Sequence, residues 1–229
     1  KVIALTGSSG KTTTKEMLGS ILSRIAPTLV TRGNLNNDLG VPVMLLELCP
    51  EHQYAVMELG ASHQGEIDYT SSLVQPLVAG IINIGTAHLG EFGGRDGICR
   101  AKSEIYAHIA PNGTSIVPAA DDFADSIRQA VQTEQVLGFG AGGEIFATEI
   151  ELQAQSATFK LNTPQGVRQV DLPFAGEHNV QNATAAAAFA LAIGISLDDI
   201  VLGLEQAVGA KGRLNFIQQG RHLLIDDTY

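Results

Sequence analysis

The most constraining feature of the sequence is a glycine-rich turn that joins a short apolar run to a helical pattern at the start of the chain. Val2–Thr6 is rich in apolar and β-branched residues and predicts a strand, while Lys11–Ile25 has the apolar spacing of a helix. The turn between them, Thr6–Thr13, has the sequence Thr-Gly-Ser-Ser-Gly-Lys-Thr-Thr. Backbone N–H groups at a helix start form, with the helix dipole, a site for anions. This order therefore predicts a phosphate-binding loop.

Within this loop the candidate nucleotide-binding residues are Gly7, Ser8, Ser9, Gly10, Lys11, Thr12 and Thr13. Glycine lets the backbone approach the phosphates, Lys11 supplies a positive charge for the terminal phosphates, and the Thr12 hydroxyl can bind Mg²⁺. One departure from the usual Gly-x-x-x-x-Gly-Lys-Thr pattern is Leu5, which stands where the first glycine is expected. The alternative is an ordinary Gly/Ser turn followed by an ordinary helix.

Alternation of apolar runs with helical patterns continues along the first 140 residues and predicts a mostly parallel sheet flanked by helices. The expected strands are Val2–Thr6, Thr28–Thr31, Gln53–Leu59, Leu77–Ile84, Thr114–Val117 and Gln135–Phe139, and the expected helices are Lys11–Ile25, Gly65–Leu73, Arg95–Ile109 and Asp121–Thr133. A small antiparallel β meander is expected over about 144–173, from looser alternation around the turn Thr163–Gly166. Two helices, Asn182–Gly194 and Ser196 to about Val208, and two strands, Arg213–Gln218 and Arg221–Asp226, complete the α/β fold class.

Composition excludes several classes of protein. The 229 residues are 45% hydrophobic, which excludes a disordered chain, and the net charge of −10 argues against binding nucleic acid or an anionic membrane surface. Cys49 and Cys99 lie far apart without a Cys-x-x-Cys motif, which favours a reducing cytoplasm. No signal peptide or membrane insertion is expected. The chain lacks an initiating Met and stops directly after a strand-like run, so we expect residues 1–229 to be one domain of a longer protein.

Polar residues follow three of the expected strands and could converge on a ligand. Glu58 ends an apolar run, His88 follows the run Leu77–Ile84 by four residues, and Asp226 ends the last strand. In open α/β sheets ligands bind at the carboxyl ends of the strands, where a carboxylate can hold Mg²⁺. The alternatives are a solvated glutamate at a strand end and a structural loop histidine.

Two Asn-rich segments and two basic residues have ordinary explanations when they are considered alone. The segments 33–42 and 176–182 have the composition of turns. Lys102 could be a solvated helix lysine and Arg213 an ordinary arginine at the start of a strand.

Taken together, these motifs resemble the Mur ligase family, the ATP-dependent amide-forming enzymes of peptidoglycan synthesis. The resemblance covers essentially the whole chain as that family's central ATPase domain, in which the first glycine of the phosphate loop is characteristically absent. Three stretches, 33–42, 58–67 and the terminal Asp-Asp-Thr-Tyr, are most similar to the member that adds D-alanyl-D-alanine to UDP-N-acetylmuramoyl tripeptide. Other Mur-type ligases and folylpolyglutamate synthase match these stretches less well.

The resemblance implies ATP and Mg²⁺ as cofactors and assigns the residues around the phosphates. Lys11 would contact the β- and γ-phosphates, Thr12 and Glu58 would hold a first Mg²⁺, and His88 would help to bind a second. Lys102 matches a position where a lysine is often carbamoylated and supports the second metal. Lys11, His88 and Lys102 are thus the predicted catalytic residues.

The remaining implied roles concern other groups of ATP and the acceptor carboxylate. Asn182 would approach the adenine, Arg213 the γ-phosphate, and Asp226 or Asp227 the ribose. Asn34 and Asn36 would lie near the metal and the acceptor carboxylate.

The implied reaction proceeds through an acyl phosphate, in which a carboxylate oxygen attacks the γ-phosphate of ATP before the amine of D-alanyl-D-alanine attacks the carbonyl carbon. The family's N-terminal domain holds the UDP-sugar and its C-terminal domain brings the amine, so we expect a monomeric, cytoplasmic bacterial enzyme of which this chain alone cannot complete the ligation. Two other classes stay open from the residues alone: a nucleotide-binding switch module and a phosphate-loop kinase.

Overall fold

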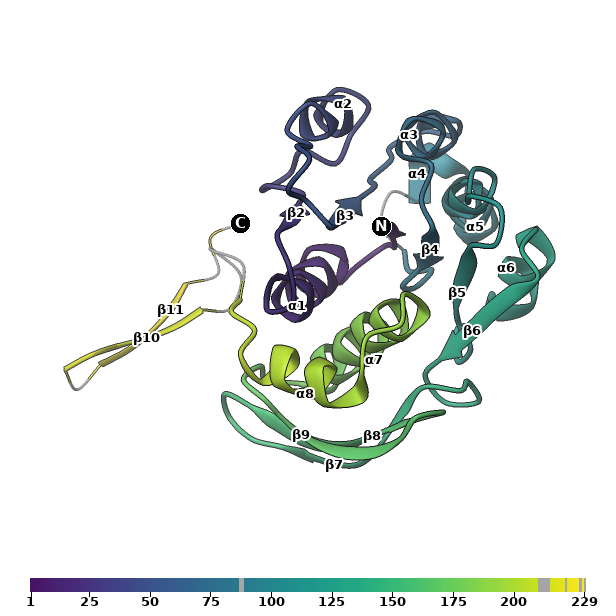
Figure 1. Cartoon of the computed structure of the whole chain (residues 1–229). Coiled ribbons are helices and arrows are strands. Elements are labelled where there is room, and N and C mark those ends of the chain that lie inside the picture. The colour runs from purple at the N-terminus through teal and green to yellow at the C-terminus, as the bar shows by residue number, and fades with distance from the viewer. Residues whose placement is uncertain (87–88, 210–214, 221, 227, 229) are drawn as a thin grey trace.

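The computed structural model describes residues 1–86, 89–209, 215–220, 222–226 and 228, and its centre is a six-stranded parallel sheet (Figure 1). The strand order is β2-β3-β1-β4-β5-β6, so the strand that precedes the phosphate loop lies inside the sheet. The strands are β1 (Val2–Thr6), β2 (Thr28–Val30), β3 (Tyr54–Glu58), β4 (Val78–Ile81), β5 (Thr114–Pro118) and β6 (Gln135–Phe139). The expected parallel sheet is confirmed.

Apolar side chains on both faces of this sheet explain why its strands are continuously hydrophobic. In β1, Ile3 and Leu5 belong to one buried cluster, whereas Ala4 between them belongs to the other. The same alternation places Val56 in the first cluster and Met57 in the second. Successive side chains of a strand point to opposite faces, so a sheet covered on both faces needs apolar residues at every position.

Helices cover both faces. The first cluster is covered by three helices, α1 (Lys11–Ser23), α7 (Glu177–Ala192) and α8 (Leu197–Glu205). The second cluster is covered by α2 (Gly40–Leu45), α3 (Glu66–Val74), α5 (Arg95–Ser103), the 3₁₀ turn Glu104–Tyr106 and α6 (Ala124–Ala130). The short helix α4 (Leu89–Phe92) precedes α5. Helices α1 and α8 approach so closely that a Cβ on Gly203 would lie 2.4 Å from Ile21 Cα. The buried alanines of α7 are also small, which allows this helix to pack closely against the sheet.

A second, three-stranded antiparallel sheet confirms the expected meander. Its strands are β7 (Phe146–Leu152), β8 (Ala157–Thr163) and β9 (Gly166–Leu172), in the order β7-β8-β9. Alternate residues of β8, Ala157, Phe159 and Leu161, are buried in the cluster that contains α7 and α8. The sheet therefore curves over these helices on the side away from the parallel sheet (Figure 1).

Two Asn-rich segments that were expected to be loops contain helical residues instead. Helix α2 begins at Gly40, inside the segment 33–42, because the Asn37 side chain accepts a hydrogen bond from the Gly40 N–H at 2.7 Å. Helix α7 begins at Glu177 rather than near Asn182, and Asn179 Nδ2 donates to the Ala175 carbonyl across its first turn. Asparagine bonds readily to nearby backbone groups, so it suits helix starts as well as turns.

Other boundaries also differ. Strand β4 ends at Ile81, three residues before the expected Ile84, and α6 is shorter than expected at both ends. Residues 82 and 83 continue beyond the strand beside the phosphate loop, as the Ser8 N–H to Asn83 carbonyl bond shows.

Near the end of the chain, β10 (Asn215–Gln219) and β11 (His222–Asp226) form an antiparallel hairpin that stands apart from the rest of the fold (Figure 1). The expected pair of strands is confirmed over these residues. No helix in the described part of the chain is long and apolar enough to cross a membrane.

Candidate functional site: a nucleotide and metal site

The phosphate loop lies where the sequence predicts, between the carboxyl end of β1 and the start of α1. Gly10 has φ 76°, a left-handed conformation that glycine adopts without strain, and its carbonyl accepts the first helical hydrogen bond from the Thr14 N–H at 2.9 Å. Lys11 Nζ donates to the Gly7 carbonyl at 2.8 Å and so folds over the loop. The lysine charge and the helix start therefore face the same small region.

Two N–H groups of the loop are already used within the protein. The Ser8 N–H donates to the Asn83 carbonyl at 3.1 Å, and the Ser9 N–H donates to Asn83 Oδ1 at 3.0 Å. The first turn of α1, which contains Thr12 and Thr13, then supplies the N–H groups for an anion. Ser8 contributes its hydroxyl, because this oxygen is buried and has no hydrogen-bond partner among the described residues.

Glu58 ends β3, and only 1% of its surface is exposed. Asn36 Nδ2 donates to Glu58 Oε1 at 2.7 Å, whereas Oε2 is buried and has no partner in the part of the chain that the structure describes. A buried carboxylate oxygen without a partner is costly, and a divalent cation would satisfy it. The carboxylate therefore fits the predicted metal role.

The donor set suits Mg²⁺ better than a metal held by the protein alone. The described residues contain no group of three or more His, Cys, Asp or Glu side chains that could hold a metal. Mg²⁺ commonly takes one or two carboxylates and completes its shell with water and substrate phosphates. Glu58 and the Thr12 hydroxyl at the start of α1 fit this pattern.

A cavity of about 170 Å³ adjoins the loop and brings together Lys11, Asn36 and Lys102. Burial, and then the nearby charge of Lys11, lower the pKa of Lys102 to about 7. The lining residues include two lysines and one acidic residue, Glu66, so this space suits an anionic group. Asn34 is exposed to solvent and is not among the residues that line the cavity.

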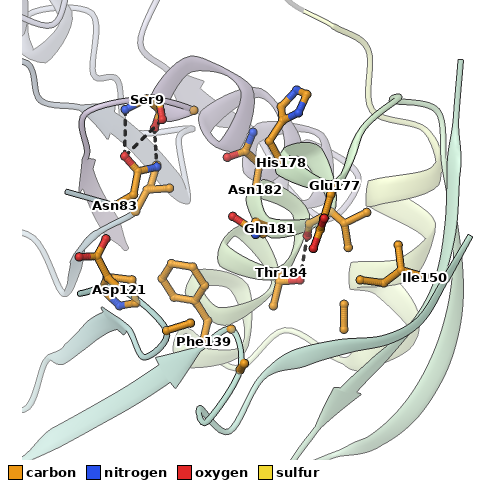
Figure 2. Close-up of a pocket in the computed structure, with 18 residues that line it drawn as sticks. Ser9, Asn83, Asp121, Phe139, Ile150, Glu177, His178, Gln181, Asn182 and Thr184 are labelled. Atoms are coloured by element: carbon orange, nitrogen blue, oxygen red, sulfur yellow. Dashed lines mark hydrogen bonds between the residues drawn. The ribbon is translucent and has the colours of Figure 1, made fainter. Parts of the chain in front are cut away.

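A larger cavity of about 580 Å³ lies between the phosphate loop, the ends of β4 to β6 and helix α7 (Figure 2). Its walls include Asn182, His178, Asp121, Phe139 and Ile150, which combine polar groups with apolar surface as in many ligand pockets. Asn182 reaches the loop itself, since a Cβ on Gly10 would lie 2.2 Å from Asn182 Oδ1. This volume is of a size for a nucleoside.

Sequence reasoning missed three residues at this site. Asn83 and Asp121 follow the buried strands β4 and β5, so the rule that selected Glu58 would also have found them. Lys15 gave no such signal: its side chain is fully buried, and its Nζ donates to the Thr31 carbonyl at 2.7 Å and pairs with Glu16. Thr31 Oγ1 in turn accepts from the Glu58 N–H at 2.9 Å, so Lys15 is linked to the Glu58 backbone through Thr31.

Four predicted site residues cannot be placed in the same detail. His88, Arg213 and Asp227 lie outside the described residues. Asp226 ends strand β11 as predicted, and the description of it stops at its backbone.

Fold and site together define a phosphate-loop nucleotide-binding domain of the parallel α/β class, with a buried carboxylate, Glu58, at the end of the strand next to β1. The family model described as the Mur ligase middle domain matches residues 5–190. The chain therefore belongs to the Mur ligase family, and the resemblance predicted from its motifs is confirmed.

Individual relatives agree with this assignment. The UDP-N-acetylmuramoyl-tripeptide–D-alanyl-D-alanine ligase of Haemophilus influenzae is 47% identical over the whole chain, which spans 51% of that protein. A crystal structure of MurF from Acinetobacter baumannii is 78% identical with a TM-score of 0.97, over 100% of this chain and 51% of that one. MurF from Thermotoga maritima in complex with ADP is 29% identical with a TM-score of 0.88, over 100% and 53%. The chain thus spans about half the length of the relatives it matches.

Proposed function

We propose that this chain is the ATP-binding domain of an ADP-forming ligase that adds D-alanyl-D-alanine to UDP-N-acetylmuramoyl tripeptide in bacterial peptidoglycan synthesis. The observation that carries the proposal is that Lys11 belongs both to the phosphate loop and to the cavity of about 170 Å³ beside it. One amine can therefore face the transferring phosphoryl group and the carboxylate that attacks it. The names of the relatives supply the two substrates.

In the proposed reaction the carboxylate oxygen of the tripeptide bonds to the γ-phosphorus of ATP while the bond to ADP breaks. The amine of D-alanyl-D-alanine then bonds to the carbonyl carbon of the acyl phosphate, loses a proton, and phosphate leaves. Two anions must meet in the first step, and Lys11 reduces their repulsion and stabilises the phosphoryl group in transfer. Mg²⁺, when bound at Glu58 and Thr12, would supply further positive charge to the phosphates.

The surrounding residues position these groups. Asn36 orients Glu58 through its 2.7 Å hydrogen bond and also lines the cavity where the acceptor carboxylate would lie. Asn182, on the second turn of α7, lies between the loop and the larger cavity, which would take the adenine. Because orientation contributes strongly to such reactions, these fixed contacts support the proposal.

Lys102 fits the proposed carbamoylation. With a pKa of about 7, a large fraction of its amines is neutral near neutral pH. A neutral amine can bond to CO₂ and release a proton, which gives a carbamate that could support a second Mg²⁺. The roles of His88, Arg213, Asp226 or Asp227 and Asn34, the monomeric state and the cytoplasmic location stay predictions.

The test uses the full-length protein that carries this chain. With ATP, Mg²⁺ and UDP-N-acetylmuramoyl tripeptide, phosphate release should require D-alanyl-D-alanine and should be lost in Lys11→Ala. Release driven equally by glutamate and a folate would overturn the proposal in favour of folylpolyglutamate synthase. A stable phosphorylated product would indicate a kinase, and hydrolysis that is indifferent to every amine would indicate a switch module.

A further inference from the structure

The segment after β4 contacts the phosphate loop along both its backbone and one side chain. The Ile82 N–H donates to the Thr6 carbonyl at 2.8 Å, and the Asn83 carbonyl accepts from the Ser8 N–H at 3.1 Å. Residues 82 and 83 thus continue alongside the loop after the ladder between β1 and β4 has ended. A neighbouring segment, rather than the loop's own hydrogen bonds, fixes the direction of the Ser8 peptide.

The Asn83 side chain adds a second set of contacts, all to Ser9 (Figure 2). Asn83 Oδ1 accepts from the Ser9 N–H at 3.0 Å and from Ser9 Oγ at 3.3 Å, while Asn83 Nδ2 donates to the Ser9 carbonyl at 3.0 Å. The amide therefore meets both backbone polar groups of one residue, as a neighbouring strand would. Of the common side chains of this size, only an amide carries an acceptor and a donor side by side.

Asn83 is itself held through the next residue. The Ile84 N–H donates to Asp121 Oδ2, and Arg95 Nη2 donates to the Ile84 carbonyl, both at 2.8 Å. Asp121 Oδ1 also accepts from the Phe123 N–H, and the Arg95 guanidinium lies 4.8 Å from the Phe123 ring centre. Both backbone groups of Ile84 are thus bonded to side chains from distant parts of the chain, Asp121 in the loop after β5 and Arg95 at the start of α5.

The loop needs this external support because its own sequence provides little. The Lys11 side chain bonds across the loop to the Gly7 carbonyl, but its amine would also serve the phosphates. Ordering a flexible loop costs conformational entropy, and a loop that is ordered before the ligand arrives removes this cost from binding.

We propose that Asn83 is a positioning residue that holds Ser8 and Ser9 in the anion-binding shape before nucleotide arrives, and that Asp121 and Arg95 hold Asn83 in place for this task. The proposal deepens the proposed function, since it concerns the nucleotide site of that reaction. It assigns to Asn83 no contact with the reacting atoms.

The first experiment compares Asn83→Ala with Asn162→Ala by isothermal titration of the chain with ADP and Mg²⁺. Asn162 is a matched control, because its amide also donates to Phe146, Thr148 and Lys160 but lies on β8 in the antiparallel sheet. Without the Asn83 side-chain bonds to Ser9, Asn83→Ala should bind ADP about tenfold or more weakly than the unchanged chain. The affinity of Asn162→Ala for ADP should stay close to that of the unchanged chain. Equal affinity of Asn83→Ala and the unchanged chain would overturn the inference.

The second experiment needs no substitution and therefore stands even where Asn83→Ala does not fold. In the nucleotide-free chain, the Ser9 amide should exchange its hydrogen as slowly as the Ile82 amide, because both are bonded to a neighbouring segment. Gly142 is the fast reference, because it is an exposed residue of the turn between β6 and β7, and exchange of the Ser9 amide as fast as that of the Gly142 amide would overturn the inference. Failure of the unchanged chain to bind ADP would instead refute the proposed function, so the two failures are distinguishable.

Discussion

Replacing Glu58 by glutamine should stabilise the chain in the absence of ligand while it removes the response to Mg²⁺. In the structure one carboxylate oxygen accepts from Asn36 and the other is buried with no partner among the described residues. Leaving a buried polar group unsatisfied costs about 1–3 kcal/mol, and more for a charged group. Glutamine keeps the oxygen that Asn36 needs and replaces a buried negative charge with a neutral group.

The two effects can be measured in one thermal unfolding experiment. A gain of about 1 kcal/mol should raise the melting temperature of a domain of this size by about 2–4 °C. Mg²⁺ and ADP at about 100 times the dissociation constant should stabilise the unchanged chain by about 2.7 kcal/mol, and Glu58→Gln should lose most of this gain. Glu151→Gln is the matched control, because it removes the same charge from an exposed position on β7.

Two results would refute the reasoning. A lower melting temperature of Glu58→Gln without ligand would show that the buried oxygen is satisfied in some other way. An unchanged gain with Mg²⁺ and ADP would show that Glu58 does not hold the metal.

Three further predictions follow from neighbouring residues. For Lys102, the folded-state pKa of about 7 lies below the ordinary 10.5, so the folded chain binds fewer protons between these values and its stability should rise with pH there. Lys102→Met should be more stable than the unchanged chain near pH 7, and urea unfolding should show this difference shrinking as the pH rises toward about 10. A difference that does not change with pH would contradict the lowered pKa of Lys102. Lys15→Met keeps the buried stem but leaves the Thr31 carbonyl without its donor, so urea unfolding should show a loss of about 1–3 kcal/mol; no loss would mean that water or another group replaces the amine. Gly10→Ala should abolish ADP binding in titration calorimetry, because φ 76° is unfavourable for alanine and its Cβ would clash with Asn182; the added change Asn182→Ala should restore part of the binding if that clash is the cause.

Much of the site was predictable because it follows the carboxyl ends of parallel strands. The phosphate loop needs only a strand, a glycine-rich turn and a helix in sequence, and all three are contiguous in residues 2–23. Glu58 could be selected because it ends a buried apolar run, and the structure places it at the end of β3. Both predictions rested on the order of residues along the chain and on the direction of the parallel strands.

Contacts between distant residues could not be predicted in this way, as Asn83, Asp121 and Lys15 show. The bonds from Asn83 to Ser9 join residues 74 positions apart, and the bond from Asp121 to Ile84 joins residues 37 apart. In the sequence Lys15 looks like a solvated helix lysine, whereas in the structure it donates to the carbonyl of Thr31, the residue after β2. Each role depends on which strands are neighbours in the sheet. The order β2-β3-β1-β4 cannot be predicted from any single segment of the sequence.

The sequence by itself determined the class of fold, the phosphate loop and the family, because these depend on contiguous patterns of apolar, glycine and charged residues. Only the tertiary structure decided that the Ser8 and Ser9 N–H groups are occupied by Asn83, that one oxygen of Glu58 has no partner among the residues that the structure describes, and that Lys11 and Lys102 share a cavity. The physical reason is that hydrogen bonds and buried charges are satisfied by whichever groups the packed strands and helices bring within reach, and those groups come from distant parts of the chain.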